Sequence, residues 1–272
     1  MKIKYYGTAA AIGVPGIFCD CDNCKRAKKL KGRNIRTRSQ ASIDDKILID
    51  FPADTYMHVI NYGLPLTKIN SCLVTHSHAD HLYEKDLLMR DERYTYLEEN
   101  KPLTMYVTSV AEKKINTINC PQSRVVTKSV TPYVPFETEG YKITPLRAVH
   151  TPSTDPVIYI IEKDGKSVFY GNDTGYLSQE IWDYFDKTKP KFNFVNLDCT
   201  LGLSYNDYCK DHMSLEECAK LRDELIAKSY ADNDTLFYLT HFAHDFPIYD
   251  EMKVIAEKYN LNVAYDGLEV EI

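Results

Sequence analysis

Short apolar runs separated by polar and turn residues are the main pattern along this chain. Runs rich in β-branched and aromatic residues predict strands near residues 2–7, 46–50, 71–75, 103–108, 141–149, 156–163, 166–171, 192–198, 235–240 and 262–272. We expect helices near residues 22–31, 53–62, 178–186, 215–229 and 248–259. Strands interspersed with helices indicate a mixed α/β protein.

Two local signals place a turn and a helix start. Asp164-Gly165, between two apolar runs, predicts a hairpin with a type I′ turn, because this turn favours Asp-Gly. Ser214 and Glu217 have the spacing of a capping box, which predicts a helix that begins at Leu215. No linker, low-complexity segment or internal repeat interrupts the pattern, so we expect one domain over residues 1–272.

The composition allows a sizeable core and argues against some partners. The chain has 272 residues, of which 44% are hydrophobic, so it is long enough to bury a core. Its formal net charge is −6 and its pI is near 5.8, which argues against a nucleic-acid partner, because such a partner calls for a basic surface. The sequence leaves a homodimer open.

The start of the chain and the cysteines bear on location. Residues 1–6 predict a strand, not a secretory segment, and no window approaches the roughly 20 apolar residues of a membrane span. We therefore expect a cytoplasmic protein with no membrane partner and no disulfides. Five cysteines are then expected to be buried or incidental thiols: Cys72, Cys120, Cys199, Cys209 and Cys218.

The densest cluster of candidate metal ligands follows the apolar run at residues 72–74. His76, His78, Asp80 and His81 place three of the eight histidines and a carboxylate within six positions. A strand that ends where a helix begins can direct the first two side chains to one ion and the last two to another, and these donors suit Zn, Mn or Fe. The alternative is a polar surface turn, which seldom contains so many histidines.

Further donors occur where later strands are expected to end. His150, Asp173 and His241 each follow an apolar run. Sites in layered α/β folds gather in the loops at one edge of the sheet, so we expect these side chains to complete a two-metal site. Taken singly, His150 and His241 are at least as typical of structural histidines.

A second metal site is predicted near the start of the chain. Cys19, Cys21 and Cys24 supply three thiols in six residues, and structural zinc normally takes four ligands. His244, three residues after His241, is the candidate for the fourth ligand. The alternatives are reduced thiols or a disulfide.

The histidine and aspartate pattern resembles the metallo-β-lactamase superfamily. The resemblance spans nearly the whole chain and implies a four-layer αββα sandwich. It implies that one ion is held by His76, His78 and His150. It also implies that the second is held by Asp80, His81 and His241, with Asp173 bridging both.

The same resemblance assigns Asp50 to the family's first motif, an acidic residue that orients the site from behind a ligand. Here the sequence departs from the family pattern. The family usually continues with a small residue and glycine, whereas this chain has Phe51-Pro52-Ala53.

The three cysteines after the glycine-containing segment 7–16 narrow the resemblance. Together with His244 they are similar to the knuckle of the phosphoribosyl cyclic phosphodiesterases, here an insertion near residues 17–38. That branch also uses a late loop histidine to assist the leaving group, which suggests His212 as general acid. The alternative for His212 is a solvated loop residue. His58 is expected to be structural or exposed.

The resemblance and the donors together predict a dinuclear metal-dependent hydrolase. We expect two active-site ions, Zn or Mn with Fe as a further alternative, and one structural Zn. We also expect a metal-bridging hydroxide that attacks a small cyclic or nucleotide-like phosphodiester. Asp80 and His212 are the predicted catalytic residues. The alternatives are an acyl hydrolase of thioesters or lactones, transfer-RNA 3′ processing, and a non-enzymatic zinc-binding or redox module.

Substrate contacts are less defined by the sequence. Eight basic residues follow the cysteines: Lys25, Arg26, Lys28, Lys29, Lys31, Arg33, Arg36 and Arg38. Such a run is typical of a solvated helix and loop. The alternative is an anion-binding rim in which Arg36 and Arg38 steer an anionic substrate. We expect pocket walls from the loops 130–139 and 151–156.

Overall fold

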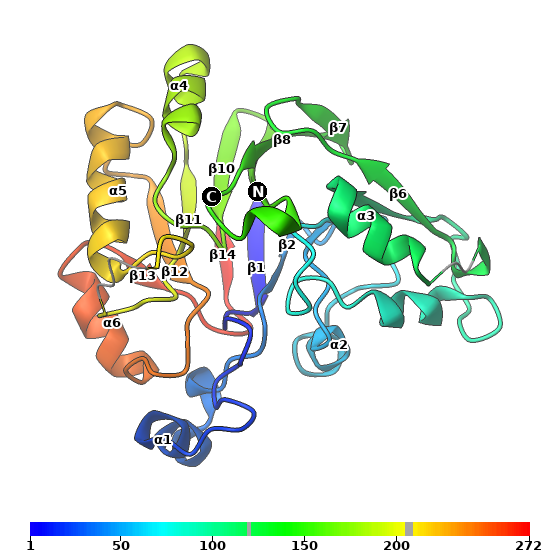
Figure 1. The fold of residues 1–272 in the computed structure, drawn as a ribbon, viewed down its shortest axis with the longest axis horizontal. Helices are drawn as coiled ribbons and strands as arrows, with labels where there is room; N and C mark the ends of the chain where they lie inside the picture. The colour runs from blue at the N-terminus through cyan, green and yellow to red at the C-terminus, as the bar shows by residue number, and fades with distance from the viewer. Residues whose placement is uncertain (119–120, 205–208) are drawn as a thin grey trace.

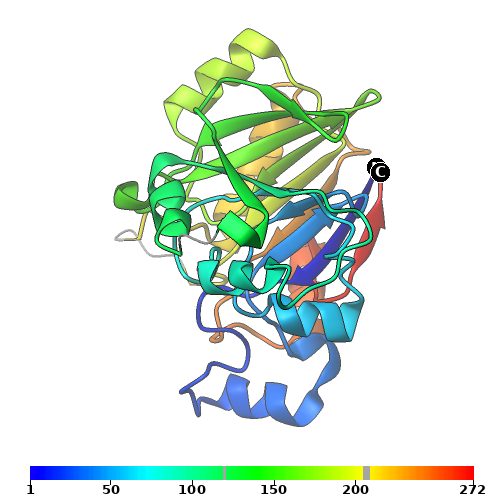
Figure 2. The same cartoon turned by 90° about the vertical axis from the view of Figure 1, so that its right-hand side faces the viewer.

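The computed structural model describes residues 1–118, 121–204 and 209–272. Within them, two sheets of seven strands face each other, and helices cover their outer faces (Figures 1 and 2). This arrangement confirms the predicted α/β fold and its αββα layers.

The first sheet has the strand order β14-β1-β2-β3-β4-β5-β6. Its strands β14, β1, β2 and β3 are antiparallel neighbours, whereas β3 to β6 run parallel. The bounds are β1 Lys2–Gly7, β2 Gln40–Ile43, β3 Ile47–Ile49, β4 Ser71–Leu73, β5 Leu103–Val107, β6 Val125–Ser129 and β14 Glu269–Glu271.

The second sheet has the order β13-β12-β11-β10-β9-β8-β7. The strands from β7 to β10 are antiparallel to their neighbours, and β10 to β13 run parallel. The bounds are β7 Phe136–Thr138, β8 Tyr141–Arg147, β9 Val157–Lys163, β10 Lys166–Gly171, β11 Phe194–Asp198, β12 Leu236–Thr240 and β13 Asn262–Val263.

Helices lie outside both sheets, and α1 extends away from them near the bottom of Figure 1. The α-helices are α1 Asp22–Leu30, α2 Thr55–Tyr62, α3 Ser109–Asn116, α4 Gln179–Thr188, α5 Leu215–Ala227 and α6 Tyr249–Glu257. The 3-10 helices are η1 Gly32–Asn34, η2 Glu84–Arg90, η3 Pro121–Ser123 and η4 Pro152–Thr154. Among the described residues, no helix is long and apolar enough to cross a membrane.

Three buried clusters hold the layers together. The cluster between the sheets includes Tyr5 and Ile49 from the first sheet and Tyr159 from the second. Helices α4, α5 and α6 bury a second cluster against the outer face of the second sheet. A third lies between α3 and the first sheet, where Ala111 and Ile115 pack on the strands. Alternate residues of a strand point to opposite faces, so the strands of this sandwich can serve two cores.

Both local turn and cap predictions are confirmed. Asp164 and Gly165 have φ values of 49° and 74°, the left-handed geometry that a type I′ turn requires, and they connect β9 to β10. The hydroxyl of Ser214 accepts a hydrogen bond from the backbone of Glu217, whose carboxylate accepts one from the backbone of Ser214. This capping box starts α5 at the predicted residue.

Several short elements escaped the sequence analysis. Strands β2, β6 and β7 and helix α3 were not predicted. The expected strand over 262–272 is two strands, β13 in the second sheet and β14 in the first. Gly267, with φ of 91°, lies between them, so the chain turns there and passes from one sheet to the other.

Candidate metal centre

Loops that follow four strands meet at one edge of the sandwich. The segment after β4 contains His76, and those after β8, β10 and β12 contain His150, Asp173 and His241. Strands β10, β11 and β12 are parallel, so their carboxyl ends lie together. The structure therefore brings together donors that are up to 165 residues apart in the chain.

The first group contains His76, His78, His150 and Asp173, whose donor atoms lie within 4.8 Å of one another. Nδ1 of His78 is 2.9 Å from Nε2 of His76 and 3.2 Å from Nε2 of His150. Zinc–nitrogen bonds of about 2.0–2.1 Å at tetrahedral angles place two nitrogens roughly 3.3 Å apart. The spacing thus fits three imidazoles around one ion.

The second group contains Asp80, His81, Asp173 and His241, again within 4.8 Å. Nε2 of His81 lies 3.2 Å from Nε2 of His241, 3.3 Å from Oδ2 of Asp80 and 3.1 Å from Oδ2 of Asp173. Two imidazoles and two carboxylates suit Zn, Mn or Fe alike.

Asp173 belongs to both groups. Its Oδ2 is 3.2 Å from Nε2 of His76 in the first group and 3.1 Å from Nε2 of His81 in the second. Its Oδ1 is buried and accepts no hydrogen bond from a protein group, although Nδ1 of His212 lies 3.2 Å away. Because a buried carboxylate oxygen normally has a partner, the residues fit metal ions better than a network of hydrogen bonds alone.

Three site residues have left-handed backbone conformations. The φ values are 65° for Asp50, 54° for Asp173 and 59° for His241. Such values are uncommon outside glycine, are enriched for Asp and His, and cluster at functional sites. The conformation ends each strand abruptly and turns the next side chain into the loop region.

Asp50 lies behind His81. Oδ2 of Asp50 is 2.7 Å from Nδ1 of His81, while its Oδ1 accepts hydrogen bonds from the backbone and hydroxyl of Thr75. A proton on Nδ1 that is shared with Asp50 leaves Nε2 of His81 free to bind a metal. Phe51, which departs from the family pattern, does not disturb this contact. Its backbone pairs with the loop of residues 74–83, here called the motif loop: Phe51 N donates to His81 O, and Phe51 O accepts from Tyr83 N.

The structure places His212 beside two carboxylates. Nδ1 of His212 is 3.2 Å from Oδ2 of Asp198 and 3.2 Å from Oδ1 of Asp173, and the side chain is 21% exposed. Burial alone would lower the pKa of His212, but the charges of Asp198 and Asp173 outweigh it and raise the pKa to about 9. His212 is therefore no solvated loop residue.

Asp198 and Thr200 were missed by the sequence analysis. Asp198 is fully buried at the end of β11, and its Oδ2 also lies 3.2 Å from Nδ1 of His241. The hydroxyl of Thr200 lies 2.7 Å from the same nitrogen. The signal was present, since β11 ends in an aspartate just as other strands end in donors. Burial would raise the pKa of Asp198, but His212 and His241 lower it to about 2.

Lys114 also escaped prediction. From α3 its ammonium donates hydrogen bonds to the carbonyl oxygens of Ser77 (2.8 Å) and Leu82 (2.7 Å), and it lies 3.6 Å from Glu84. These carbonyls belong to the loop that carries the histidine motif. Lys114 thus anchors that loop to α3. The sequence around Lys114 contains no pattern that predicts this role.

The donors open into a pocket of about 440 Å³. Its described walls include donors of both groups, His212, the segment Ala10–Gly13, and Thr151, Thr200, Cys209, Asp211 and Ala243. The predicted loop 151–156 contributes Thr151, but loop 130–139 does not line this pocket. Residues 10–13 take that place because Ala9 forms backbone bridges to Arg38 and Phe242.

The alternative of an anion-binding rim does not hold for Arg36 and Arg38, the two arginines expected to steer the substrate. Arg36 is only 7% exposed and donates hydrogen bonds to Thr8 and to the carbonyl oxygen of Ala264. Arg38 is bound to Asp54 and to the carbonyl oxygen of Ala11. Both side chains hold the fold together, and neither lines the pocket.

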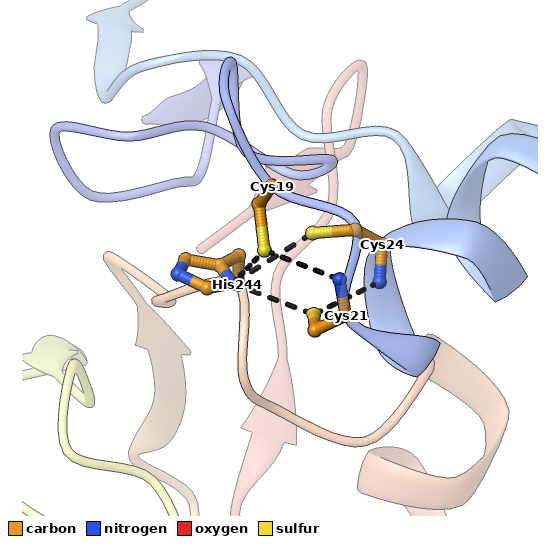
Figure 3. Close-up of side chains that lie close together, drawn as sticks. All are labelled: Cys19, Cys21, Cys24 and His244. Atoms are coloured by element: carbon orange, nitrogen blue, oxygen red, sulfur yellow. Dashed lines mark hydrogen bonds between the residues drawn. The ribbon is translucent and has the colours of Figure 1, made fainter.

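The three cysteines and His244 meet as a second site, here called the knuckle (Figure 3). Nδ1 of His244 is 3.4 Å from Sγ of Cys19 and 3.7 Å from Sγ of both Cys21 and Cys24. Zinc bonds of about 2.3 Å to sulfur and 2.0–2.1 Å to nitrogen imply a spacing of roughly 3.6 Å. The arrangement fits a zinc ion. A disulfide is absent among these described thiols.

The other predicted thiols are mostly buried. Cys72, Cys199 and Cys218 are fully buried, and Cys209 is half-buried in the pocket wall. Cys120 lies outside the described residues. His58 is buried and structural, as expected, with Nδ1 2.6 Å from Oε1 of Gln40.

Comparisons with known proteins agree with this geometry. Residues 47–242 match a family model described as the β-lactamase superfamily domain. Over 108 residues the chain is 30% identical to a UPF0173 metal-dependent hydrolase of Sulfurisphaera tokodaii. That match covers 39% of this chain and 44% of the relative, so it spans less than half of the relative's length.

Two solved structures show the same fold. Zinc-bound PqqB from Methylobacterium extorquens has a TM-score of 0.78 at 19% identity, with 100% of both chains covered. A diphosphatase of the PhnP family has a TM-score of 0.77 at 21% identity, with 100% of this chain and 97% of that chain covered. At these identities the likeness concerns the fold.

Proposed function

Because the chain belongs to the β-lactamase superfamily domain family, we propose that it is a metal-dependent hydrolase, and specifically a phosphodiesterase with two active-site ions. The first ion would be held by His76, His78 and His150 and the second by Asp80, His81 and His241. Asp173 would bridge them.

The observation that carries this proposal is the position of Asp173 Oδ2. It lies 3.2 Å from a nitrogen of the first group and 3.1 Å from a nitrogen of the second. One carboxylate oxygen shared by two histidine sets is an arrangement for two cations. Two ions so placed would lower the pKa of a water and neutralise charge on phosphoryl oxygens.

The chain's own residues prepare this centre. Asp50 holds His81, and Thr200 and Asp198 hold His241, so that Nε2 of each imidazole faces the metal position. Burial lowers the pKa of His76 to about 4. That imidazole is therefore neutral near pH 7, as a ligand must be.

His212 is the proposed proton donor to the leaving alkoxide. Its Nδ1 is hydrogen-bonded to Oδ2 of Asp198, which leaves Nε2 as the nitrogen for a substrate in the pocket that His212 lines. The two carboxylates favour the protonated imidazole, as a general acid requires. Asp198 acts as the residue that positions His212.

Several observations support a small phosphodiester over the alternatives. The fold resembles a diphosphatase of the PhnP family, and the knuckle accompanies the dinuclear donor set. Transfer-RNA processing calls for a basic gripping surface, whereas the net charge is −6. An acyl hydrolase would use the same donors, so it is the competitor that the test must separate.

The direct test is hydrolysis of a ribose cyclic phosphate beside a thioester, using purified protein of measured metal content. We expect turnover of the phosphate, lost in His76→Ala, which removes a donor of the first group. Turnover of the thioester alone would transfer the proposal to acyl hydrolysis.

A second test addresses His212. His212→Ala should slow alkyl phosphodiesters by about 10²–10⁴-fold and p-nitrophenyl esters much less, because a good leaving group needs no proton. Asp198→Asn should show the same dependence on the leaving group, more weakly. Equal losses on both ester classes would contradict the acid role.

For the knuckle we propose one structural zinc held by Cys19, Cys21, Cys24 and His244. His244 follows His241 by three residues, so the zinc would brace the loop that supplies a donor of the active site.

A further inference from the structure

We propose that the pocket selects phosphodiesters with a single negative charge, whose uncharged remainder lies along residues 10–13. This inference rests on the proposed phosphodiesterase function and adds a charge limit to it. It also replaces the expectation of an anion-steering rim.

The first observation is the lack of cationic side chains in the pocket. Among the residues that the structure describes, no lysine or arginine lines it. The sequence between Ser204 and Cys209 is Tyr-Asn-Asp-Tyr and contains neither residue type. A second phosphate on the substrate would therefore lose water without gaining a lysine or arginine partner, since His212 and the proposed metal positions serve the phosphodiester that is cleaved.

Arg36 and Arg38, which bond to Val14 and Ala11 beside the wall of residues 10–13, are already engaged. The exposed Lys210 does not line the pocket although it stands between Cys209 and Asp211 in the chain. Arg38 donates to the carbonyl oxygen of Ala11 and to Asp54, 3.0 Å away. Arg36 is buried, with its guanidinium 4.3 Å from the ring centre of Phe242. Moving Arg36 to a substrate phosphate would leave the buried Thr8 and Ala264 oxygens without their hydrogen bonds, and moving Arg38 would break its ion pair with Asp54.

The second observation is a negative charge in the wall. Asp211 lines the pocket, and its backbone carbonyl lies 3.3 Å from Nδ1 of His150, so the residue sits directly beside the first donor group. Its carboxylate is 3.4 Å from the hydroxyl of Thr151 and is paired with no cation among the described residues. The Asp211 carboxylate would repel a second anionic group of a substrate. The pocket would therefore discriminate against doubly charged substrates through an unfavourable contact.

The third observation is that part of the pocket wall is uncharged. Ala10, Ala11, Ile12 and Gly13 form one wall together with Ala243. Ile12 is 48% exposed, so an apolar or neutral part of a substrate could cover it. A pocket of about 440 Å³ is large enough for a nucleoside-sized group.

The test compares two esters with the same leaving group. One is the p-nitrophenyl ester of thymidine 5′-phosphate, which carries one negative charge. The other carries an added 3′-phosphate. We expect kcat/KM to be at least about tenfold lower for the second ester, mainly through KM, with a gap that narrows as salt is added. Calorimetric binding of the corresponding phosphorothioates should show the same order.

Substitutions in the wall provide matched controls. Ile12→Arg should lower KM for the ester with the 3′-phosphate and close most of the gap. Ile12→Gln introduces a neutral side chain and should leave the difference in kcat/KM between the two esters unchanged. Asp211→Asn should narrow it by removing the repelling charge.

The outcomes separate the two proposals. Equal kcat/KM for both esters, or preference for the added phosphate, overturns the charge limit and leaves the phosphodiesterase function standing. No hydrolysis of either ester by metal-loaded protein that cleaves a thioester overturns the function and the charge limit with it.

Discussion

Oδ2 of Asp50 lies 2.7 Å from Nδ1 of His81, and both side chains are fully buried. The contact joins the loop after β3 to the histidine motif after β4, two strands that pair in parallel. The carboxylate therefore determines which nitrogen of His81 faces Asp80 and Asp173, the position proposed for the second ion.

Replacement of Asp50 by Asn should weaken metal binding. Asparagine tolerates the left-handed backbone at this position, so Asp50→Asn removes the charge with little strain. We expect a 10–100-fold loss of metal affinity, measured by titration of metal-free protein. Asp183→Asn, on the exposed face of α4, is the control. Unchanged affinity in Asp50→Asn would remove Asp50 from the site.

Lys114→Met should loosen the motif loop. The variant leaves the carbonyl oxygens of Ser77 and Leu82 without a charged donor, which we expect to cost roughly 1–3 kcal/mol of unfolding free energy and to lower metal affinity. Lys113→Met, one residue earlier and exposed, is the matched control. Denaturant unfolding and metal titration would check both. Identical behaviour of the two variants would contradict the assignment.

Cys21→Ser should remove one zinc per chain. Because zinc binding contributes to folding free energy, the variant should also have a lower Tm, while the two ions of the active site stay bound. Metal analysis and thermal unfolding measure these effects. Cys209→Ser, outside the knuckle, should keep the full zinc content. Unchanged zinc content in Cys21→Ser would show that the knuckle is no metal site.

The stability of the protein should fall between pH 6.5 and 4 through His58. Burial lowers the pKa of His58 to about 4. Below pH 6.5 the unfolded chain therefore binds a proton at His58 that the folded chain does not, so the contribution is complete above pH 6.5 and lost as pH falls. The shift corresponds to about 3 kcal/mol.

The measurement for His58 is the free energy of unfolding against pH. His58→Gln should lose about 3 kcal/mol less than the unchanged protein between pH 7 and pH 4, whatever its stability at pH 7. The difference between the two proteins isolates this histidine from the other titrating groups. Parallel curves would show that His58 is not buried in its neutral form.

Much of the fold could be predicted because it is encoded locally. The capping box at Ser214 and the turn at Asp164-Gly165 depend on neighbouring residues alone, and both formed as expected. Strand β7 has three residues, and α3 buries only Ala111 and Ile115. Such short elements carry too little periodicity to be recognised and are stabilised by the layers around them.

Some residues of the candidate site could likewise be predicted from local sequence, whereas others could not. The spacing of His76, His78, Asp80 and His81 marked the motif, and the ends of strands marked the more distant donors. The same rule pointed to Asp198, but its partner His241 lies 43 residues further along the chain. Nothing in the local sequence of Asp198 shows that contact.

The two arginines show the limit most clearly. A run of basic residues favours a solvated surface. For Arg36 this expectation was wrong, because Thr8 after β1, Ala264 before β14 and the ring of Phe242 enclose its guanidinium.

The sequence by itself determined which donors the protein has and that strands end at them, because periodicity and turn chemistry act over a few residues. Only the tertiary structure decided which nitrogens face one another, which carboxylates stand behind them, and that no described lysine or arginine lines the pocket. Those properties depend on packing between segments far apart in the chain, where burial and hydrogen bonds reassign what a side chain does.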